Sequence, residues 1–177
     1  MHKALIVVDM QNDFVFGPLG TPEARAIIPA IQQKIKDVEG EKGFANNMVF
    51  FTRDTHFGNY LSSAEGRKLP VPHCIHASDG WKIIEKLPTY GRRIVDKLTF
   101  GYDSWRGDPD ICKAEVIELC GVCTDICVVS NALILKALFP DKEIVVDASC
   151  CAGTTPTNHR AALQVMKSCH ITIVDDK

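Results

Sequence analysis

The sequence has no apolar run long enough to cross a membrane. Its longest apolar stretches, ALIVVDM, NMVFFT and EIVVDA, fall well short of the roughly 20 residues that a transmembrane helix needs. It also has no basic stripe and no acidic tail, since the charges are spread along the chain and the formal net charge is −2. We therefore expect neither a membrane association nor a nucleic-acid partner.

Signals for export and for several domains are also lacking. The chain runs from MHK directly into a strand-like stretch, without the charged and apolar regions of a signal peptide. It has no internal repeat, low-complexity segment or linker, and a length of 177 residues suits one domain. We therefore expect a single domain over residues 1–177 and a cytoplasmic location.

A disulfide framework is not expected either, although the chain has eight cysteines. In a reducing compartment, thiols are more often metal-bound, catalytic or buried. Cys120 and Cys123 form a C-x-x-C pair, but no second pair follows at zinc-ribbon spacing. The stretch CGVCTDICVVSNAL, from Cys120 to Leu133, is therefore open to four interpretations: a metal knuckle, a disulfide pair, buried packing or a nucleophile.

Apolar runs that alternate with helical patterns predict the fold. Strands are expected over residues 3–9, 48–53, 92–97, 115–119, 143–147 and 170–174, and helices over 22–38, 79–87, 124–138 and 156–168. Residues 57–78 are rich in Gly, Pro, Ser and His and predict a long loop, which in a compact domain is usually functional. The fold class is therefore α/β, with a doubly wound, mostly parallel six-stranded sheet and helices on both faces.

Ligands of such sheets bind beyond the carboxyl ends of the strands, which selects three residues here. Asp9 ends the first strand, Lys97 ends the third, and Cys127 falls in the first turn of the helix after the fourth. A helix N-terminus lowers the pKa of a thiol, and its free N–H groups can stabilise an oxyanion. Together the three suit a nucleophile, a base and an orienting cation. Taken singly, each also fits a structural role, namely packing, a helix cap and a surface lysine.

A second group of polar residues follows the second strand. Asp54 and His56 lie two apart on an extended segment, so their side chains point the same way. Glu65 and His73 in the following loop complete a mixed nitrogen and oxygen ligand set that suits Zn, Fe or Mn. A turn aspartate and loop histidines bonded to backbone are the structural alternatives.

Six segments in order resemble the isochorismatase-like cysteine hydrolases, and within them the nicotinamidase (pyrazinamidase) branch. The segments span essentially the whole chain, and their combination is far more specific than any one of them. They are ALIVVDMQNDF, TRDTHFGNY, PVPHC, VDKLTFGYDSW, LCGVCTDICVVSNAL and DASCCAGTTPTNHRAALQVM.

The resemblance implies a role for each residue of the first group. Asp9 would be the general base, Lys97 its charge partner and Cys127 the nucleophile. A cis peptide is implied between Val122 and Cys123, with the backbone N–H groups of Cys123 and Cys127 as the oxyanion hole. The other cysteines, namely Cys74, Cys112, Cys120, Cys150, Cys151 and Cys169, are expected to be structural and buried.

The resemblance also implies a divalent metal, with zinc preferred over iron or manganese. Asp54, His56 and His73 correspond to the family's ligands, and Glu65 to its fourth position, which varies between histidine and acid. The implied partner is a small amide, and family members are often homo-oligomers, so a homo-oligomer is expected here.

The implied reaction is hydrolysis of nicotinamide to nicotinate and ammonia. Where many nicotinamidases carry an aromatic residue that stacks on the pyridine, this sequence has Pro70, so Phe16 or Tyr60 is a candidate replacement. The residues expected to contact the substrate are Phe14, Tyr102 and Val122.

Three alternative functions follow from the same residues. A cysteine amidase of this fold that acts on a carbamoyl, ureido or other small amide is the nearest, but the metal set favours a nicotinamidase. Vinyl-ether hydrolysis of the isochorismatase type is disfavoured, because those enzymes lack the cysteine. A non-catalytic zinc or redox module would use Cys120, Cys123 and Cys127.

Overall fold

Six parallel strands form one sheet at the centre of the protein. The computed structural model describes residues 2–40 and 48–175. The strand order is β3-β2-β1-β4-β5-β6, and all five neighbouring pairs are parallel. The strands are β1 (Lys3–Val8), β2 (Met48–Asp54), β3 (Arg93–Lys97), β4 (Val116–Val122), β5 (Glu143–Ala152) and β6 (Thr172–Val174). This arrangement confirms the predicted α/β fold class.

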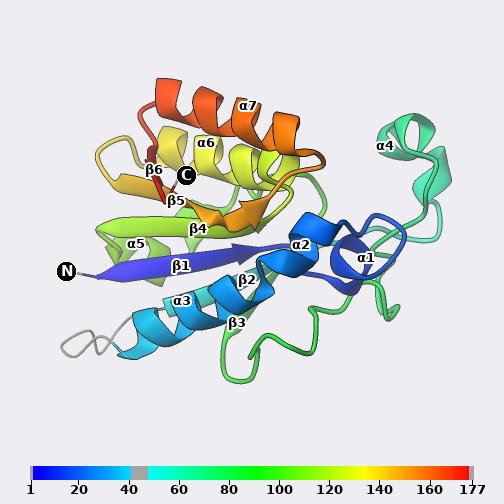
Figure 1. Ribbon diagram of the computed structural model, residues 1–177, viewed down its shortest axis with the longest axis horizontal. Coiled ribbons are helices and arrows are strands. Elements are labelled where there is room, and N and C mark those ends of the chain that lie inside the picture. The colour runs from blue at the N-terminus through cyan, green and yellow to red at the C-terminus, as the bar shows by residue number, and fades with distance from the viewer. Residues whose placement is uncertain (1, 41–47, 176–177) are drawn as a thin grey trace.

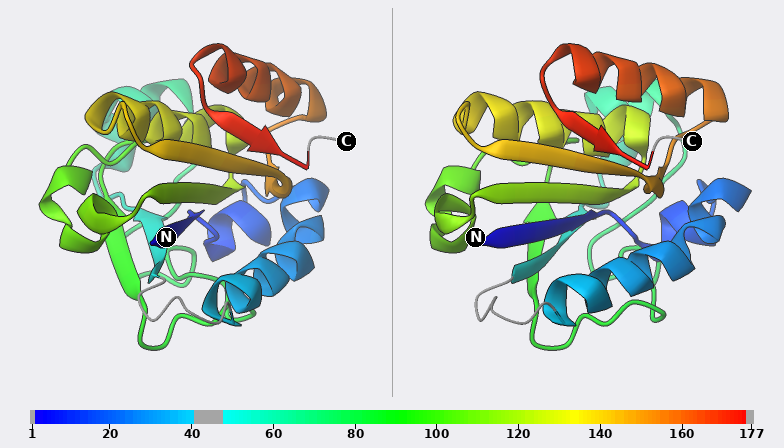
Figure 2. Two further views of the ribbon diagram at one scale, coloured as in Figure 1. Left: turned by 90° about the vertical axis from the view of Figure 1, so that its left-hand side faces the viewer. Right: turned by 60° about the vertical axis from the view of Figure 1, so that its left-hand side comes forward.

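Helices cover both faces of the sheet, as Figures 1 and 2 show from three sides. One face is covered by α2 (Pro22–Ala26) and α3 (Ile28–Gly40), and the other by α6 (Val129–Leu138) and α7 (Pro156–Ser168). The short helices α1 (Asn12–Val15) and α4 (Ala64–Lys68) lie beyond the end to which the β1 arrow points (Figure 1). The remaining short elements are α5 (Pro109–Lys113), the 3-10 turns at Tyr60–Ser62 and Trp105–Gly107, and the π-helical turn at Thr124–Val128.

The central strands are buried on both faces, which explains their continuous apolar sequences. Residues 4–8 of β1 are all buried, and β4 is buried from Ile117 to Val122. Gly121 in β4 has φ +114°, and a Cβ there would lie 2.2 Å from the backbone oxygen of Val8. Only glycine therefore allows β4 to approach β1 this closely just before the chain reaches Cys123.

A group of buried charges interrupts this apolar interior beneath α3. Lys34 Nζ lies 2.6 Å from Glu118 Oε1 and 2.5 Å from Asp147 Oδ2, and Lys3 also contacts Glu118. Because each carboxylate has an ammonium partner, the cost of burying the charges is offset in part.

Two predicted helices differ from the structure. The helix expected over residues 22–38 is split at Ile27 into α2 and α3, because Pro29 has no N–H to donate to the preceding turn. The helix expected over residues 79–87 is absent. Its backbone instead pairs with the segment after β1, where Ile84 N donates to Met10 O at 2.9 Å and Asn12 N donates to Lys82 O at 2.9 Å.

Other boundaries shift without changing the topology. β4 and β5 extend beyond their predicted ends, and the predicted loop 57–78 contains a 3-10 turn and α4. Burial of the structural cysteines is confirmed for Cys74, Cys120, Cys150 and Cys151. The prediction of burial is wrong for Cys112 and Cys169, which are exposed. Across residues 2–40 and 48–175, no helix has both the length and the apolar character needed to span a bilayer.

Candidate active site

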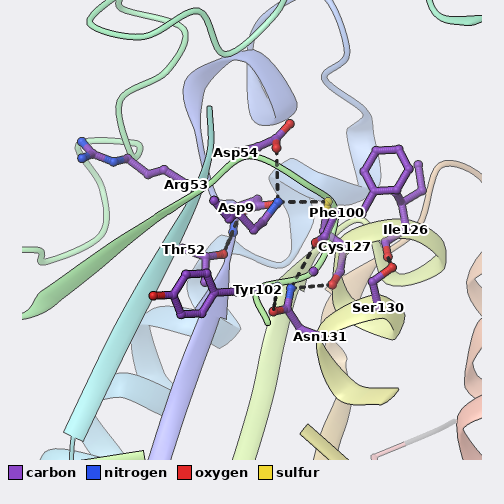
Figure 3. A network of polar contacts seen from close by, with 12 residues as sticks. Asp9, Thr52, Arg53, Asp54, Phe100, Tyr102, Ile126, Cys127, Ser130 and Asn131 are labelled. Atoms are coloured by element: carbon purple, nitrogen blue, oxygen red, sulfur yellow. Dashed lines mark hydrogen bonds and ion pairs between the residues drawn. The ribbon is translucent and has the colours of Figure 1, made fainter. Parts of the chain in front are cut away.

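The carboxyl ends of β1, β2 and β3 bring Asp9, Asp54 and Lys97 together. Asp54 and Lys97 are register partners in the pairing of β2 with β3, so their side chains emerge on the same face. Lys97 is buried, and its Nζ lies 2.7 Å from Asp9 Oδ2 and 3.3 Å from Asp54 Oδ1. One buried ammonium thus joins two carboxylates, Asp9 and Asp54, which Figure 3 labels at the ends of β1 and β2.

Asp9 is held in a fixed orientation by β2. Its backbone has φ 49°, a left-handed conformation that aspartate tolerates better than most residues. Thr52 donates its hydroxyl to Asp9 Oδ1 at 2.6 Å and accepts the backbone N–H of Asp9 at 3.2 Å. Oδ2 has no partner at hydrogen-bond angles and faces Lys97 as an ion pair, which leaves it available to a proton.

Cys127 approaches the same ammonium from the other side. It lies in a π-helical turn over Thr124–Val128 that continues into α6, and its Sγ is 3.6 Å from Lys97 Nζ. The peptide bond between Val122 and Cys123 is cis, as the resemblance implies. The structure therefore brings Asp9 and Cys127 into contact with the same ammonium, that of Lys97, at the edge of the sheet where the sequence predicts all three.

Burial controls the ionisation of this trio. It raises the pKa of the Cys127 thiol well above its usual range, and the negative charge of Asp9 raises it further, with Lys97 opposing both. The expected lowering of this pKa by the helix N-terminus is therefore wrong. Burial also raises the pKa of Asp9, although Lys97 opposes it. Burial thus favours the neutral thiol at Cys127 and makes the Asp9 carboxylate a stronger base.

Four side chains next to this trio form a group suited to a metal ion. One ligand atom from each of Asp54, His56, Glu65 and His73 lies within 4.8 Å of the others. Of all the residues described, these are the only group of three or more His, Cys, Asp or Glu side chains that converge in this way. A zinc site built on Cys120, Cys123 and Cys127 finds no counterpart there.

The histidines of this group are oriented as metal ligands. His73 Nδ1 lies 2.8 Å from the carbonyl of Val71, which can only accept, so Nδ1 carries the proton and Nε2 is left free. His56 Nε2 is buried and lacks a hydrogen bond of acceptable geometry, although Asp54 Oδ2 lies 3.0 Å away. Two free imidazole nitrogens between two carboxylates fit a divalent transition metal.

A cavity of about 730 Å³ opens above both groups. Cys127, Cys123, Asp54, Glu65 and His73 lie in its wall. The rest of the lining is mostly apolar and comprises Phe14, Leu19, Ala64, Leu69, Leu98, Phe100 and Ile126, with Thr21, Lys68, Thr99 and Thr154.

The predicted substrate contacts are placed differently. Phe14 lines the cavity and packs against the His73 ring at 5.4 Å. Tyr102 and Val122 are not among the lining residues, and Tyr102 packs on Trp105 with 5.0 Å between the rings.

The candidate replacements for the stacking aromatic also lie elsewhere. Tyr60 is buried, packs against His56 at 4.6 Å, and donates its hydroxyl to Leu69 O. Phe16 lines a separate surface depression.

Most of the apolar wall was not anticipated from the sequence. Leu98 and Phe100 directly follow Lys97, and Ile126 precedes Cys127, so adjacency to the candidate catalytic residues was the available signal. Leu19 and Leu69 lie in loops without periodicity and carried no such signal.

The family model of the isochorismatase domain matches residues 3–176. The chain belongs to the isochorismatase family. A nicotinamidase from Schizosaccharomyces pombe is 24% identical over 216 residues, which cover 99% of this chain and 94% of the relative.

Two solved structures extend the comparison. A pyrazinamidase of Pyrococcus horikoshii in complex with zinc is 31% identical, with a TM-score of 0.77 and coverage of 97% of this chain and 98% of that one. An N-carbamoylsarcosine amidase from Thermoplasma acidophilum is 25% identical, with a TM-score of 0.77 and coverage of 98% and 95%. Membership of the family and these relatives identify the protein as a hydrolase that acts on amide C–N bonds.

Proposed function

We propose that this amidohydrolase is a metal-dependent nicotinamidase that works through a thioester on Cys127. The observation that carries the proposal is the contact of one buried ammonium, Lys97, with the Asp9 carboxylate and the Cys127 sulfur, directly beside the four-residue metal group. Relatives named for nicotinamide and pyrazinamide hydrolysis support this substrate class.

Asp9 and Cys127 form the proton-transfer pair in this mechanism. Asp9 Oδ2 and the Cys127 sulfur lie 2.7 Å and 3.6 Å from the same Lys97 ammonium, so Asp9 is placed to take the thiol proton as the sulfur attacks the amide carbon. Asp9 then gives the proton to the departing ammonia, which leaves a thioester. It next removes a proton from the water that hydrolyses the thioester, and the returning proton restores the thiol.

Lys97 and two backbone N–H groups stabilise the negative charges that develop during the reaction. The ammonium lies 3.6 Å from the sulfur, so it stabilises the thiolate as the charge moves from Asp9 to Cys127. The oxyanion that forms on the amide carbonyl is assigned to the backbone N–H groups of Cys123 and Cys127, at the start of the helix.

The metal site is assigned to Asp54, His56, Glu65 and His73, with zinc preferred over iron or manganese. When bound, the ion would act as a Lewis acid toward a polar group of the substrate, which in nicotinamide is the ring nitrogen. Phe14 forms the apolar wall beside His73 and limits the positions of the ring. A homo-oligomer and a cytoplasmic location remain predictions.

Ammonia release from nicotinamide by the zinc-loaded protein tests the proposal. We expect turnover that disappears in Cys127→Ala and persists in Cys112→Ala, which removes an exposed thiol that does not line the cavity. Turnover that survives Cys127→Ala would refute the thioester mechanism. No turnover of nicotinamide, with hydrolysis of another amide that depends on Cys127, would refute only the substrate.

A carbamoyl amide is the second candidate substrate. The similarity to an N-carbamoylsarcosine amidase over nearly the whole chain favours it. Ammonia release from N-carbamoyl amino acids, measured beside nicotinamide with the same protein, distinguishes the two.

A further inference from the structure

The cavity above Cys127 is much larger than a single pyridine ring requires. Its volume of about 730 Å³ falls within the range of roughly 300–1,000 Å³ found for sites that bury drug-sized ligands. Cys127, Asp54 and His73 are buried and form the inner end of the cavity, whereas the polar lining residues Lys68, Thr99 and Thr154 are exposed. Space therefore remains between the reacting amide and the solvent.

The outer part of the cavity is lined by large apolar side chains that solvent reaches. Leu98 is 65% exposed, Phe100 is 43% exposed and Leu69 is 37% exposed, yet all three belong to the lining of the same cavity. Single exposed apolar residues are common on proteins, but a group around one opening marks a binding surface. Leu19 and Ile126 continue this lining.

The segment that carries Leu98 and Phe100 is fixed rather than loose. Lys97 Nζ donates to Thr99 O at 3.3 Å, and the Thr99 hydroxyl donates to Gly101 O at 2.6 Å. The side-chain amide of Asn131 donates to Phe100 O at 3.2 Å. The apolar surface is thus held in place before a ligand arrives, which lowers the entropy that binding costs.

Resting on the proposed amidase function, we propose that Leu19, Leu69, Leu98, Phe100 and Ile126 form an outer apolar subsite. The subsite binds an alkyl or aryl substituent of the amide, so primary amides larger than nicotinamide are substrates as well. The reaction is the same, because the carboxamide still reaches Cys127 and only the substituent extends toward solvent.

Binding to the Cys127→Ala protein tests the subsite independently of turnover. Straight-chain primary amides from butanamide to octanamide are titrated into the zinc-loaded variant by calorimetry. We expect the affinity to rise about fourfold for each added methylene until the subsite is filled. An affinity that does not change with chain length would overturn the proposal.

Turnover by the active protein gives the second measurement. We expect kcat/KM for octanamide relative to butanamide to fall about tenfold in Leu98→Ser, whereas Tyr90→Ser leaves the ratio unchanged. Tyr90 is 97% exposed and lies outside the cavity lining, so it is a matched loss of surface apolar area. An unchanged ratio in Leu98→Ser would overturn the subsite.

The two proposals fail in distinguishable ways. Binding that strengthens with chain length, without ammonia release from any amide, would refute the amidase mechanism and leave the apolar subsite standing. A flat binding series, together with a Leu98→Ser variant that turns an oligomer into a monomer in sedimentation, would assign the apolar rim to a second copy of the chain and overturn the subsite.

Discussion

The side-chain amide of Asn131 donates a hydrogen bond of 2.8 Å to the backbone carbonyl of Cys127, one turn earlier in the same helical segment. The same amide group also donates to Phe100 O, while its oxygen accepts the N–H of Tyr102 at 3.0 Å and the indole N–H of Trp105 at 3.2 Å. Asn131 is buried and its hydrogen-bonding capacity is fully used (Figure 3). Asn131 therefore links the turn that carries Cys127 to the segment that carries Phe100 and Tyr102, part of which lines the cavity.

Asn131→Ala should lower both stability and turnover. Four hydrogen bonds to a fully buried side chain are lost, so we expect the free energy of unfolding to fall by about 2 kcal/mol or more. Urea unfolding measures this loss, and Gln33→Ala, which removes an exposed amide on α3, should change stability by less than about 0.5 kcal/mol. Equal effects of the two substitutions would show that the Asn131 contacts contribute little.

Asp9→Asn should abolish most of the turnover without unfolding the protein. The amide keeps an acceptor for the Thr52 hydroxyl but cannot take the thiol proton, so we expect kcat to fall by about 10²–10⁴-fold. Ammonia release and circular dichroism measure the two effects. Asp96→Asn, which changes an acid paired with Arg53 at the surface, is the control and should retain its activity.

Substitution of a histidine in the metal group should weaken zinc binding, whereas substitution of a neighbouring histidine outside the group should not. His73→Ala takes away a buried imidazole of the four-residue group, whereas His76→Ala takes away an exposed ring that packs on Trp81. We expect zinc affinity, measured by competition with a chromogenic chelator, to fall by more than about 100-fold for His73→Ala and to stay unchanged for His76→Ala. Matching affinities would exclude His73 as a ligand.

The ion pairs of Lys34 with Glu118 and Asp147 beneath α3 should make the stability of the protein fall at acid pH. Burial raises the pKa of Asp147, but hydrogen bonds from Lys34 and Ser149 outweigh it, so the folded-state pKa lies below the unfolded value of about 3.9. Asp147 therefore contributes stability that is fully present above that value and is lost as the pH falls through the lowered native pKa.

Thermal unfolding between pH 2 and pH 6 measures this contribution. Asp147→Asn should lower stability at pH 6 by about 3 kcal/mol, because Lys34 loses one of its two buried partners. The variant should also flatten the acid side of the stability profile. A profile parallel to that of the parent protein would assign the acid sensitivity to other carboxylates.

The parts of the site that the sequence predicts are those fixed by strand ends. Asp9, Asp54 and Lys97 each follow an apolar run, and a parallel sheet brings such ends to one edge whatever the details of packing. His73 could be proposed only from its residue type in the following loop, because its approach to the site depends on the path of that loop.

Burial and long-range backbone pairing account for what the sequence did not predict. The Cys127 pKa was misjudged because the helix N-terminus is a local feature, whereas burial depends on the whole fold. The absent helix over residues 79–87 has the same origin, since its backbone bonds to residues some seventy positions earlier. Leu98 and Phe100 were overlooked because exposed apolar residues in a loop form no periodic pattern.

Gly101 packs closely against α6, and this contact matters for protein engineering. A Cβ at Gly101 would lie 2.4 Å from Ile134 Cδ1 and 3.3 Å from the backbone carbon of Ser130, so a larger residue at this point requires the Ile134 side chain to move. Exchange of residues 98–105 for the loop of a relative, a common route to a new substrate range, would therefore also have to accommodate Ile134 of α6. A library that varies this loop together with residue 134 would sample more well-packed variants than one that varies the loop alone.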